Sequence, residues 1–382
     1  LQAVRQGQGR QPLFQRENDA GEGPQHLRVL RHGQSGLHQR HPGFQRQVLG
    51  PRIVLEAFHN VQNPNKVACG ACRSLNVSDV QHLNLPPVLL GLDAGGSGTK
   101  WHLRRGDGTL AQVTLGQGRT APLTTLVLGT PQGQAALAEL RAALPAPPDA
   151  LHAGLPGLAR GTERAAWVQH LLAETFNLPA AHVGVESDLD LAFRAHLRPG
   201  EGALLYAGTG SIAYGILADG RVIRAGGRGY RIGDDGGGSS IGRLALRWLT
   251  AYMDVGEVPQ GALAQELRAV MGGLDWDTVR AFVYETPGAS ALAKLALPVS
   301  NAALQNDESA LDILRQAAES LADLAGRIRQ QAGLPAWPVI ATGGALQSEP
   351  LAAMLREALP GVTIQFRAHE ATASALALDL LP

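Results

Sequence analysis

The run Leu89-Leu90-Gly91-Leu92-Asp93-Ala94-Gly95-Gly96-Ser97-Gly98-Thr99-Lys100 decides the fold of this chain. Its apolar first half is too short for a helix and long enough for a strand, so we expect a buried strand over residues 88–92. Glycines after a strand let backbone N–H groups converge on an anion without obstruction by Cβ atoms. The aspartate at the strand end adds a carboxylate, as a Mg²⁺ ion bridging phosphate oxygens requires. The run therefore predicts a buried strand that leads into a phosphate-binding turn.

A second copy of this pattern occurs later in the chain. The apolar run 203–207 opens directly into Gly208-Thr209-Gly210-Ser211. Hairpin signals follow both loops, with predicted strands at 101–105 and 109–115 after the first loop and at 212–217 and 221–225 after the second. We therefore expect two related halves whose loops face each other across a cleft and hold one polyphosphate.

Helices alternate with these strands. Apolar spacing predicts helices over 130–144 and 163–176, with strands over 150–155 and 182–185, and a largely helical region over 249–332. A further strand is expected at 339–342, and an alanine-rich last helix at 369–378. We expect this last helix to pack against the second half of the chain, or else to pack back on the first. The alternation is typical of a layered α/β protein with loops at the sheet ends over a cleft.

Four motifs occur in order along the chain: Asp-Ala-Gly-Gly-Ser-Gly-Thr at 93–99, Gly-Thr-Gly-Ser at 208–211, Gly-Gly-Arg-Gly-Tyr-Arg-Ile-Gly-Asp-Asp-Gly at 226–236 and Thr-Gly-Gly-Ala at 342–345. They resemble those of the BadF/BadG/BcrA/BcrD ATPase family, and within it are most similar to the N-acetylglucosamine kinases of the sugar kinase, Hsp70 and actin superfamily. The resemblance implies an α/β fold of two ribonuclease H-like (actin-like ATPase) domains facing across a nucleotide cleft. These domains would span residues 87–198 and 199–382, the second with a helical insertion.

The resemblance also implies ATP and Mg²⁺ as cofactors. Asp93 is expected to orient the Mg²⁺ ion, either directly or through its water shell. The ATP phosphates are expected to contact the residues of the two glycine loops, namely Gly95, Gly96, Ser97, Gly98, Thr99, Gly208, Thr209, Gly210 and Ser211. Adenosine is expected to contact the turn that matches the family's adenosine motif, namely Gly343, Gly344 and Ala345.

Asp188 is the predicted catalytic base. It lies just past a predicted strand at the start of a helix, where a carboxylate can face the cleft, and it resembles the family's aspartate at this place. A sugar hydroxyl must lose its proton as it attacks the γ-phosphorus, and a positioned carboxylate accepts it. Two alternatives remain open: Asp188 could only cap the helix, or Asp190 could be the base.

The glycine-rich stretch 226–238 is too irregular for a strand or helix. The resemblance implies that this loop contacts both sugar and nucleotide, with substrate contacts from Gly227, Gly229, Asp234 and Asp235. The two aspartates are expected near the metal or the substrate, although two adjacent aspartates can also be solvated turn residues. This stretch departs from the kinase pattern, because Arg228 replaces a frequent tryptophan and Asp235 a glutamate. Residues 119–122 also lack the asparagine that contacts the sugar in the family. The phosphate site is therefore better supported than the identity of the sugar.

Composition is typical of a globular enzyme. The 382 residues are 45% hydrophobic and 17% charged, and the net charge is +0, so nothing attracts the chain generally to nucleic acid or to an anionic membrane. No apolar run is long enough to span a membrane and no signal peptide is evident, so the cytoplasm is the expected location. The expected partner is a sugar substrate, and the sequence allows a homodimer.

The first 86 residues differ from the rest. They are rich in Gln, Arg, Gly and His and lack apolar periodicity, so we expect a disordered or non-native extension. The pair Cys69 and Cys72 lies in this extension and is interpreted as incidental, because four zinc ligands are not evident. The rest of the chain has no cysteine, whereas family members that activate dehydratases use cysteine to hold an iron–sulfur cluster.

The leading hypothesis is an ATP-dependent sugar kinase whose acceptor is an amino sugar such as N-acetylglucosamine. One alternative is a BadF/BadG-type ATPase that couples ATP hydrolysis to a partner protein, although the missing cluster cysteines disfavour its redox version. Another is a sugar-sensing DNA-binding regulator, which would require a helix-turn-helix that the extension lacks the apolar period to form.

Overall fold

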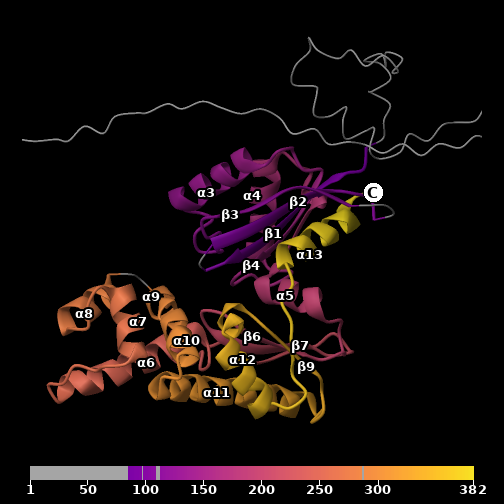
Figure 1. The fold of residues 1–382 in the computed structure, drawn as a ribbon. Coiled ribbons are helices and arrows are strands. Elements are labelled where there is room, and N and C mark those ends of the chain that lie inside the picture. Colours follow the sequence, from indigo (N-terminus) through magenta and orange to yellow (C-terminus); the bar gives the residue numbers. More distant parts are fainter. Residues whose placement is uncertain (1–84, 97, 109–111, 286–287) are drawn as a thin grey trace, which may run out of the picture. The chain divides into compact units, whose positions relative to one another are not determined.

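The computed structural model describes residues 85–96, 98–108, 112–285 and 288–382. The chain divides into two compact units, Leu1–His82 and Leu83–Pro382, and the described residues all belong to the second. Residues 1–84 of the predicted N-terminal extension, with the cysteine pair, therefore lie outside the described residues, as does Ser97 of the first glycine loop. Element labels follow Figure 1.

The first half of this unit contains a five-stranded sheet of order β3-β2-β1-β4-β5. β1 is antiparallel to β2, which is antiparallel to β3, whereas β1, β4 and β5 are parallel. The strand bounds are β1 (Val88–Gly95), β2 (Gly98–Arg105), β3 (Val113–Thr120), β4 (Ala150–Leu155) and β5 (Val183–Ser187).

The prediction for the third strand was wrong in its bounds. β3 runs over Val113–Thr120, so it extends past the predicted end at residue 115, and it includes Gly116 and Gly118, which disfavour a strand locally. Residues 109–111 of the prediction lie outside the described residues. These glycines lie against the indole of Trp101 on β2, and a Cβ atom at Gly118 would be 2.8 Å from that ring. Packing against Trp101 therefore favours a strand at these glycines, although their local propensity does not.

The second half repeats the first. Its five-stranded sheet has the order β10-β9-β6-β7-β8, in which β6-β7-β8 is an antiparallel meander and β9 and β10 are parallel to β6. The bounds are β6 (Ala203–Ala207), β7 (Ser211–Ile216), β8 (Val222–Gly226), β9 (Val339–Thr342) and β10 (Thr363–Ile364). Each sheet is thus a meander with two parallel strands beside its first strand, which confirms the predicted internal duplication.

The helices of the first half are α3 (Pro131–Ala143), α4 (Glu163–Phe176), the short η1 (Ala180–His182) and α5 (Asp188–His196). The second half has α6 (Gly238–Asp254), α7 (Ala262–Met271), α8 (Trp276–Tyr284), α9 (Ser290–Lys294), α10 (Ala296–Leu304), α11 (Glu308–Ala332), η2 (Gly344–Gln347), α12 (Glu349–Ala358), α13 (His369–Leu376) and η3 (Ala377–Leu380). Within the described ranges, no helix combines the length and apolarity that crossing a membrane requires.

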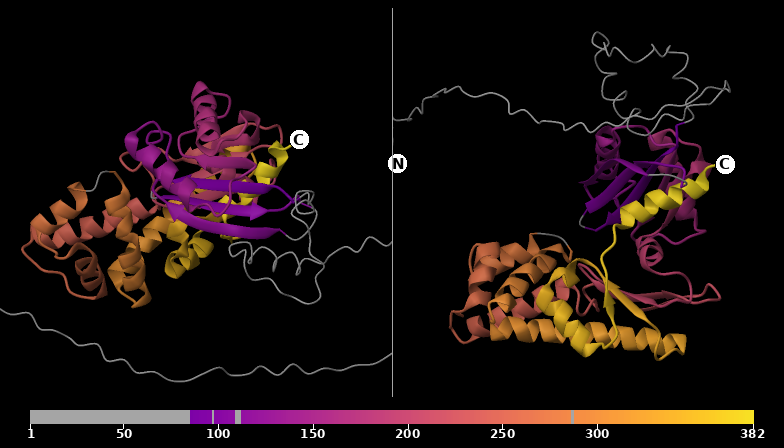
Figure 2. Two further views of the ribbon diagram at one scale, coloured as in Figure 1. Left: turned by 90° about the horizontal axis from the view of Figure 1, so that it is seen from above. Right: turned by 45° about the vertical axis from the view of Figure 1, so that its right-hand side comes forward.

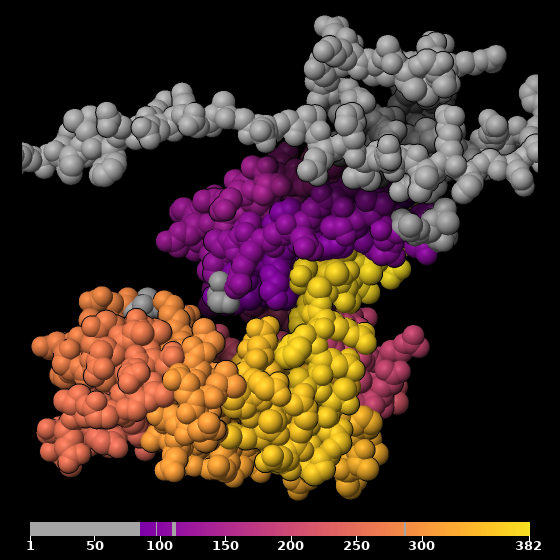
Figure 3. All heavy atoms as spheres, in the orientation of Figure 1, coloured from indigo at the N-terminus to yellow at the C-terminus, as the bar shows by residue number. Residues whose placement is uncertain are grey.

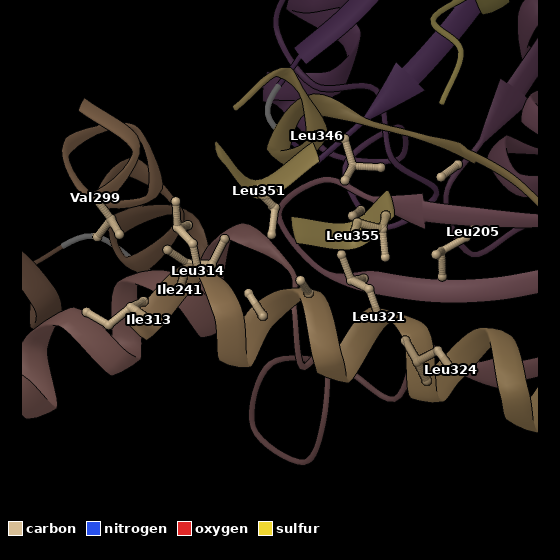
Figure 4. Packing of buried hydrophobic residues seen from close by; sticks show 14 of the residues in the cluster. Leu205, Ile241, Val299, Ile313, Leu314, Leu321, Leu324, Leu346, Leu351 and Leu355 are labelled. Carbon is tan, nitrogen blue, oxygen red and sulfur yellow. The ribbon is translucent and has the colours of Figure 1, made fainter. Parts of the chain in front are cut away.

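A core lies on one face of each sheet. On the first sheet, Leu90 and Leu92 of β1 belong to the same buried cluster as Leu140 of α3 and Val168 of α4. On the second sheet, α11 lays its apolar stripe along the strands, with Leu321 and Leu324 pointing toward Leu205 of β6 (Figure 4). The alternation of side chains along each strand leaves its other face for a different set of contacts.

α5 and α13 occupy those other faces. α5 contacts β4 and β5 of the first sheet, and its residues Ala192 and Phe193 pack against Leu204 and Tyr214 of the second. α13 lies along β1 and β2, as Figures 1 and 2 show. In the space-filling view, the yellow C-terminal segment reaches the indigo first half (Figure 3). The expectation that the last helix packs against the second half was therefore wrong, and its alternative, packing back on the first, describes α13.

Gly91 explains why α13 can lie so close to β1. A Cβ atom at Gly91 would be 2.0 Å from the carbonyl oxygen of Glu370 and 2.2 Å from the amide nitrogen of Ser374. The helix is also held by the Arg104 side chain, whose Nε donates to the Ser374 carbonyl oxygen at 3.2 Å. Only glycine at position 91 permits this backbone-to-backbone approach.

Candidate functional site

A cavity of about 500 Å³ lies where strand ends of both sheets meet α5 and α13. In open α/β sheets, ligands commonly bind beyond the carboxyl ends of the strands, and Asp93, Asp188 and Tyr206 lie at or just after the ends of β1, β5 and β6. The lining residues are Asp93, Ala94, Gly95, Gly98, Lys100, Arg119, Pro156, Asp188, Leu189, Tyr206, Gly210, Ser211, Ile212, Arg224, Gly227, Gly229, Asp234 and His369.

The first glycine loop is a tight hairpin between β1 and β2. Gly95 pairs with Gly98, so Gly96 stands at the tip of the turn, and Asp93 pairs with Gly154 on β4. The Asp93 carboxylate is mostly buried, with 15% of the side chain exposed, and two groups approach its Oδ2 atom. These are Lys100 Nζ at 3.9 Å and His369 Nδ1 at 3.5 Å.

Thr99, which is predicted to contact phosphate, is not among the residues that line the cavity. Its side chain is fully buried, and its Oγ1 accepts a hydrogen bond from the backbone N–H of Leu123 at 2.9 Å. This bond attaches the segment after β3 to the start of β2. In this structure the hydroxyl of Thr99 therefore has a structural partner, and Gly95 and Gly98 are the loop residues that face the cavity.

Asp188 is the first residue of α5 and lines the cavity. The N-cap is Ser187, whose Oγ accepts from the Asp190 N–H at 2.9 Å, so the alternative that Asp188 caps the helix is wrong. Burial raises the pKa of Asp188 to about 6, and the charges of Asp93 and Asp190 add to this shift. A carboxyl group with such a pKa exchanges a proton near neutral pH.

Asp190, the competing candidate, is held by other groups. Its Oδ1 accepts from the Tyr214 hydroxyl at 2.6 Å, and its Oδ2 accepts from the Ser187 hydroxyl at 3.0 Å. It is not among the residues that line the cavity. Its contacts join the start of α5 to β7 of the second sheet, which gives Asp190 a structural role.

Glu186 stabilises the chain just before Asp188. This residue of β5 is fully buried, and its carboxylate binds His152 Nε2 at 2.8 Å, Arg194 Nε at 3.0 Å and the Arg160 guanidinium. Burial alone would raise the pKa of Glu186, but the His152 hydrogen bond and the two arginine charges outweigh it and leave the pKa below its usual value. Three partners therefore fix the backbone that presents Asp188.

The second glycine loop rests on the start of α6. The carbonyl oxygens of Gly208 and Thr209 accept from the N–H groups of Gly238 and Ser239, both at 2.8 Å. Gly210 and Ser211 line the cavity, whereas Gly208 and Thr209 do not. A Cβ atom at Gly210 would be 2.4 Å from Asp234 Oδ2, so the glycine makes room for that carboxylate.

The two aspartates of the 226–238 stretch have different surroundings. Asp234 has a positive φ of 65°, lines the cavity and accepts from the Gly229 N–H at 3.2 Å. Asp235 does not line the cavity: 62% of its side chain is exposed, and its Oδ1 lies 3.3 Å from Arg243 Nη2. The predicted substrate contact of Asp235 is thus not supported, because its carboxylate pairs with α6.

The predicted adenosine turn follows β9, next to the end of β6. Gly343 has a φ of 113°, and a Cβ atom there would be 2.3 Å from the carbonyl oxygen of Ala207. The turn is therefore close to the second glycine loop, although Gly343, Gly344 and Ala345 do not line the cavity described above.

The structure thus brings together many of the predicted residues, and it adds others. The predicted residues that line the cavity are Asp93, Gly95, Gly98, Asp188, Gly210, Ser211, Gly227, Gly229 and Asp234. Those that do not are Gly96, Thr99, Gly208, Thr209, Asp235, Gly343, Gly344 and Ala345. Sequence reasoning gave no role to the lining residues Lys100, Arg119, Tyr206, Arg224 and His369. Of these five residues, only Lys100 could have been predicted from the sequence, because it directly follows the first glycine loop.

The carboxylates fit a magnesium ion bound mainly through a nucleotide. Among the described residues, no three His, Cys, Asp or Glu side chains form a cluster able to hold a metal by themselves. Mg²⁺ in phosphate sites usually takes one or two carboxylates and keeps water and phosphate oxygens as its other ligands. Asp93 and Asp188 line one cavity and repel each other, as the raised pKa of Asp188 shows. A cation between phosphate and Asp93 would relieve this repulsion.

Comparison with known proteins identifies the fold. The chain is 26% identical to a protein from Chromobacterium violaceum that is provisionally assigned as an N-acetylglucosamine kinase, with a TM-score of 0.58 over 76% of this chain and 99% of that one. A protein from Porphyromonas gingivalis with the same provisional assignment has 17% identity and a TM-score of 0.56, again over 76% and 99% of the two chains. The two sheets therefore form the two-domain, actin-like ATPase fold of sugar kinases.

The family follows from the sequence match. The model of the BadF/BadG/BcrA/BcrD ATPase family matches residues 90–375, and the chain belongs to this family. A curated relative, the N-acetylmuramic acid/N-acetylglucosamine kinase of Clostridium acetobutylicum, is 41% identical over 63 residues. That match spans 16% of this chain and 21% of the relative, so it covers about a fifth of the relative's length.

Proposed function

We propose that this protein is an ATP-dependent sugar kinase that phosphorylates a hydroxyl of an amino sugar such as N-acetylglucosamine. The observation that carries the proposal is the meeting, in one cavity, of a glycine loop from each sheet with the carboxylates of Asp93 and Asp188. Phosphoryl transfer depends on positioning and charge stabilisation around the phosphates, together with one group that accepts the proton of the attacking hydroxyl. The family and the names of the similar proteins support the same reaction class.

Each residue has a distinct task in this proposal. The backbone at Gly95, Gly98 and Gly210 can approach the phosphates closely, because no Cβ atoms stand between. Asp93 would hold the Mg²⁺ ion, directly or through water. When bound, the ion neutralises charge on the phosphate oxygens. Lys100 and Arg119 line the same cavity and would add positive charge near the phosphates.

Asp188 would accept the proton of the sugar hydroxyl. Its pKa of about 6 suits this task, because the carboxylate is ionised at neutral pH and yet basic enough to take up a proton. Asp234, Gly227 and Gly229 also line the cavity and would contact the acceptor. Asp190 is committed to Tyr214 and Ser187, which favours Asp188 as the base.

A panel of acceptors tests the proposal. The protein is incubated with Mg·ATP and, separately, with N-acetylglucosamine, N-acetylmuramic acid, glucose or no sugar, and ADP and phosphosugar are quantified. The proposal predicts ADP release that depends on an amino sugar and is matched by phosphosugar. ADP release at the same rate without sugar would instead indicate the second candidate, a partner-coupled ATPase. Residues 85–382 contain no cysteine, which disfavours the iron–sulfur form of that candidate.

A further inference from the structure

His369 lies against the carboxylate that is proposed to orient the metal. It is the first residue of α13, only 8% of it is exposed, and it lines the cavity. Its Nδ1 atom is 3.5 Å from Asp93 Oδ2. This contact joins two residues that are far apart in sequence, and neither the motifs nor the helical pattern of the last segment indicates it.

The fold fixes this contact through β1. Gly91 and Asp93 are two residues apart on a strand and therefore point to the same face of the sheet. The missing side chain of Gly91 lets α13 approach the strand at backbone distance, and Asp93 then meets the first residue of that helix. Ser374 holds the helix further along, because its Oγ lies 2.9 Å from His102 Nδ1 on β2.

The ring of His369 packs against two other elements. It packs edge to face against His196 of α5, with ring centroids 5.6 Å apart, and it is tilted against Tyr206 of β6 at 6.4 Å. Its Nε2 atom is buried and, among the described residues, has no hydrogen-bond partner. The described polar contact of this ring is therefore the one between its Nδ1 atom and the Asp93 carboxylate.

The chemistry of the contact favours a hydrogen on the Nδ1 atom of His369. A carboxylate oxygen is an acceptor, so a bare Nδ1 atom facing it would be repelled, whereas an N–H at Nδ1 is attracted. Carboxylates that bind metals are commonly oriented by such a donor behind them, and loss of the donor typically lowers metal affinity or activity by about 10- to 100-fold.

We propose that His369 is a positioning residue for Asp93: its Nδ1–H holds the carboxylate in the orientation that binding of the magnesium–nucleotide complex requires. The proposal rests on the proposed function in assigning Asp93 to the metal. It assigns a role in the phosphate site to the C-terminal helix, which contributes none of the recognised motifs.

Three substitutions separate the donor from the packing. In His369→Asn the side-chain amide can place its N–H near the position of Nδ1, so donation to Asp93 is kept. In His369→Gln the amide reaches the position of Nε2 instead, and His369→Leu keeps apolar volume without a donor. His196→Leu is the matched control, because His196 touches the same ring and is as buried, with 9% exposed, yet does not line the cavity.

The readout is the binding of a non-hydrolysable ATP analogue, measured by calorimetry over a series of Mg²⁺ concentrations. We expect the Mg²⁺ concentration for half-maximal binding to rise about 10- to 100-fold in His369→Leu and His369→Gln. It should stay within about threefold of wild type in His369→Asn and in His196→Leu. Thermal melts of all four variants show whether each is folded.

The outcomes are separable from those of the sugar assay, because the binding experiment contains no sugar. If the variants bind the analogue with the expected pattern but the wild-type protein phosphorylates no sugar, the positioning role of His369 stands and the proposed kinase function is refuted. The positioning role would be overturned if wild-type binding did not depend on Mg²⁺, or if His369→Asn and His369→Leu shifted the Mg²⁺ dependence equally. An unchanged Mg²⁺ dependence in folded His369→Leu would also overturn it.

Discussion

Replacing Asp188 with asparagine is expected to remove most of the phosphorylation activity and, at the same time, to stabilise the unliganded protein above pH 6. Burial, followed by the charges of Asp93 and Asp190, raises the pKa of Asp188 in the folded chain from 3.8 to about 6. The folded state therefore disfavours the ionised form. Asparagine has nearly the same size and carries no charge at any pH.

The size of the stability change follows from the shift in pKa. Between about pH 4 and pH 6 the folded protein holds the Asp188 proton more tightly than the unfolded chain, so the free energy of unfolding falls as pH rises through this window. A shift of about two units corresponds to about 3 kcal/mol. We therefore expect Asp188→Asn to be up to about 3 kcal/mol more stable than wild type at pH 8, and nearly equal to it at pH 4.

The activity change has the opposite sign. Loss of a general base typically lowers the rate by about 10² to 10⁴, or about 3 to 5 kcal/mol of barrier. ATP affinity should barely change, because Asp188 is not assigned to the nucleotide. The assays are urea unfolding at several pH values, turnover with Mg·ATP and an amino sugar, and the Kd of an ATP analogue.

Asp190→Asn is the matched comparison. Asp190 accepts hydrogen bonds from Tyr214 and Ser187, so weakening them should cost about 1 to 3 kcal/mol of stability at neutral pH. Its effect on turnover should be less than that of Asp188→Asn. The assignment of the base would be refuted if Asp188→Asn kept near-normal turnover. The raised pKa of Asp188 would be refuted if Asp188→Asn unfolded at a lower urea concentration than wild type at pH 8.

Three further predictions follow from the same structure. If Asp188 is the base, it must be ionised in the free enzyme, so kcat/KM should fall about tenfold per pH unit below pH 6; a profile that stays flat to pH 5 would exclude this role. Gly91→Ala should lower the melting temperature, because the new Cβ atom would meet the backbone of Glu370 and Ser374 and overpacking costs at least about 1 to 3 kcal/mol; an unchanged melting temperature would contradict the packing of α13. Deleting residues 1–84 should leave soluble protein that binds nucleotide, because residues 83–382 form a compact unit of their own; loss of folding would show that the segment belongs to the fold.

Much of the fold could be predicted because its signals are local. Short apolar runs that end in glycine loops mark β1 and β6, and the order of strands and helices repeats in the two halves. The same patterns located Asp93 and Asp188 at strand ends, where the topology brings them to one cavity. An element could be predicted from the sequence wherever the residues that determine it lie within the element itself.

The remaining features depend on contacts between distant residues. The glycines of β3 are typical of a loop in the sequence, and they form a strand because they pack against the Trp101 side chain of β2. Asp235 and Asp234 are adjacent and look equivalent in sequence. In the structure, Asp235 is exposed and pairs with Arg243 of α6, whereas Asp234 lines the cavity. The place of α13, and with it the contact between His369 and Asp93, depends on one missing side chain in β1.

Quantifying products in a single reaction with Mg·ATP and N-acetylglucosamine tests the central claim most directly. Phosphorus NMR resolves ADP, inorganic phosphate and sugar phosphate in the same sample. We predict one phosphosugar for each ADP, little inorganic phosphate, and the loss of both products in Asp188→Asn. ADP accompanied by inorganic phosphate, at a rate that is independent of the sugar and unaffected by Asp188→Asn, would contradict this claim.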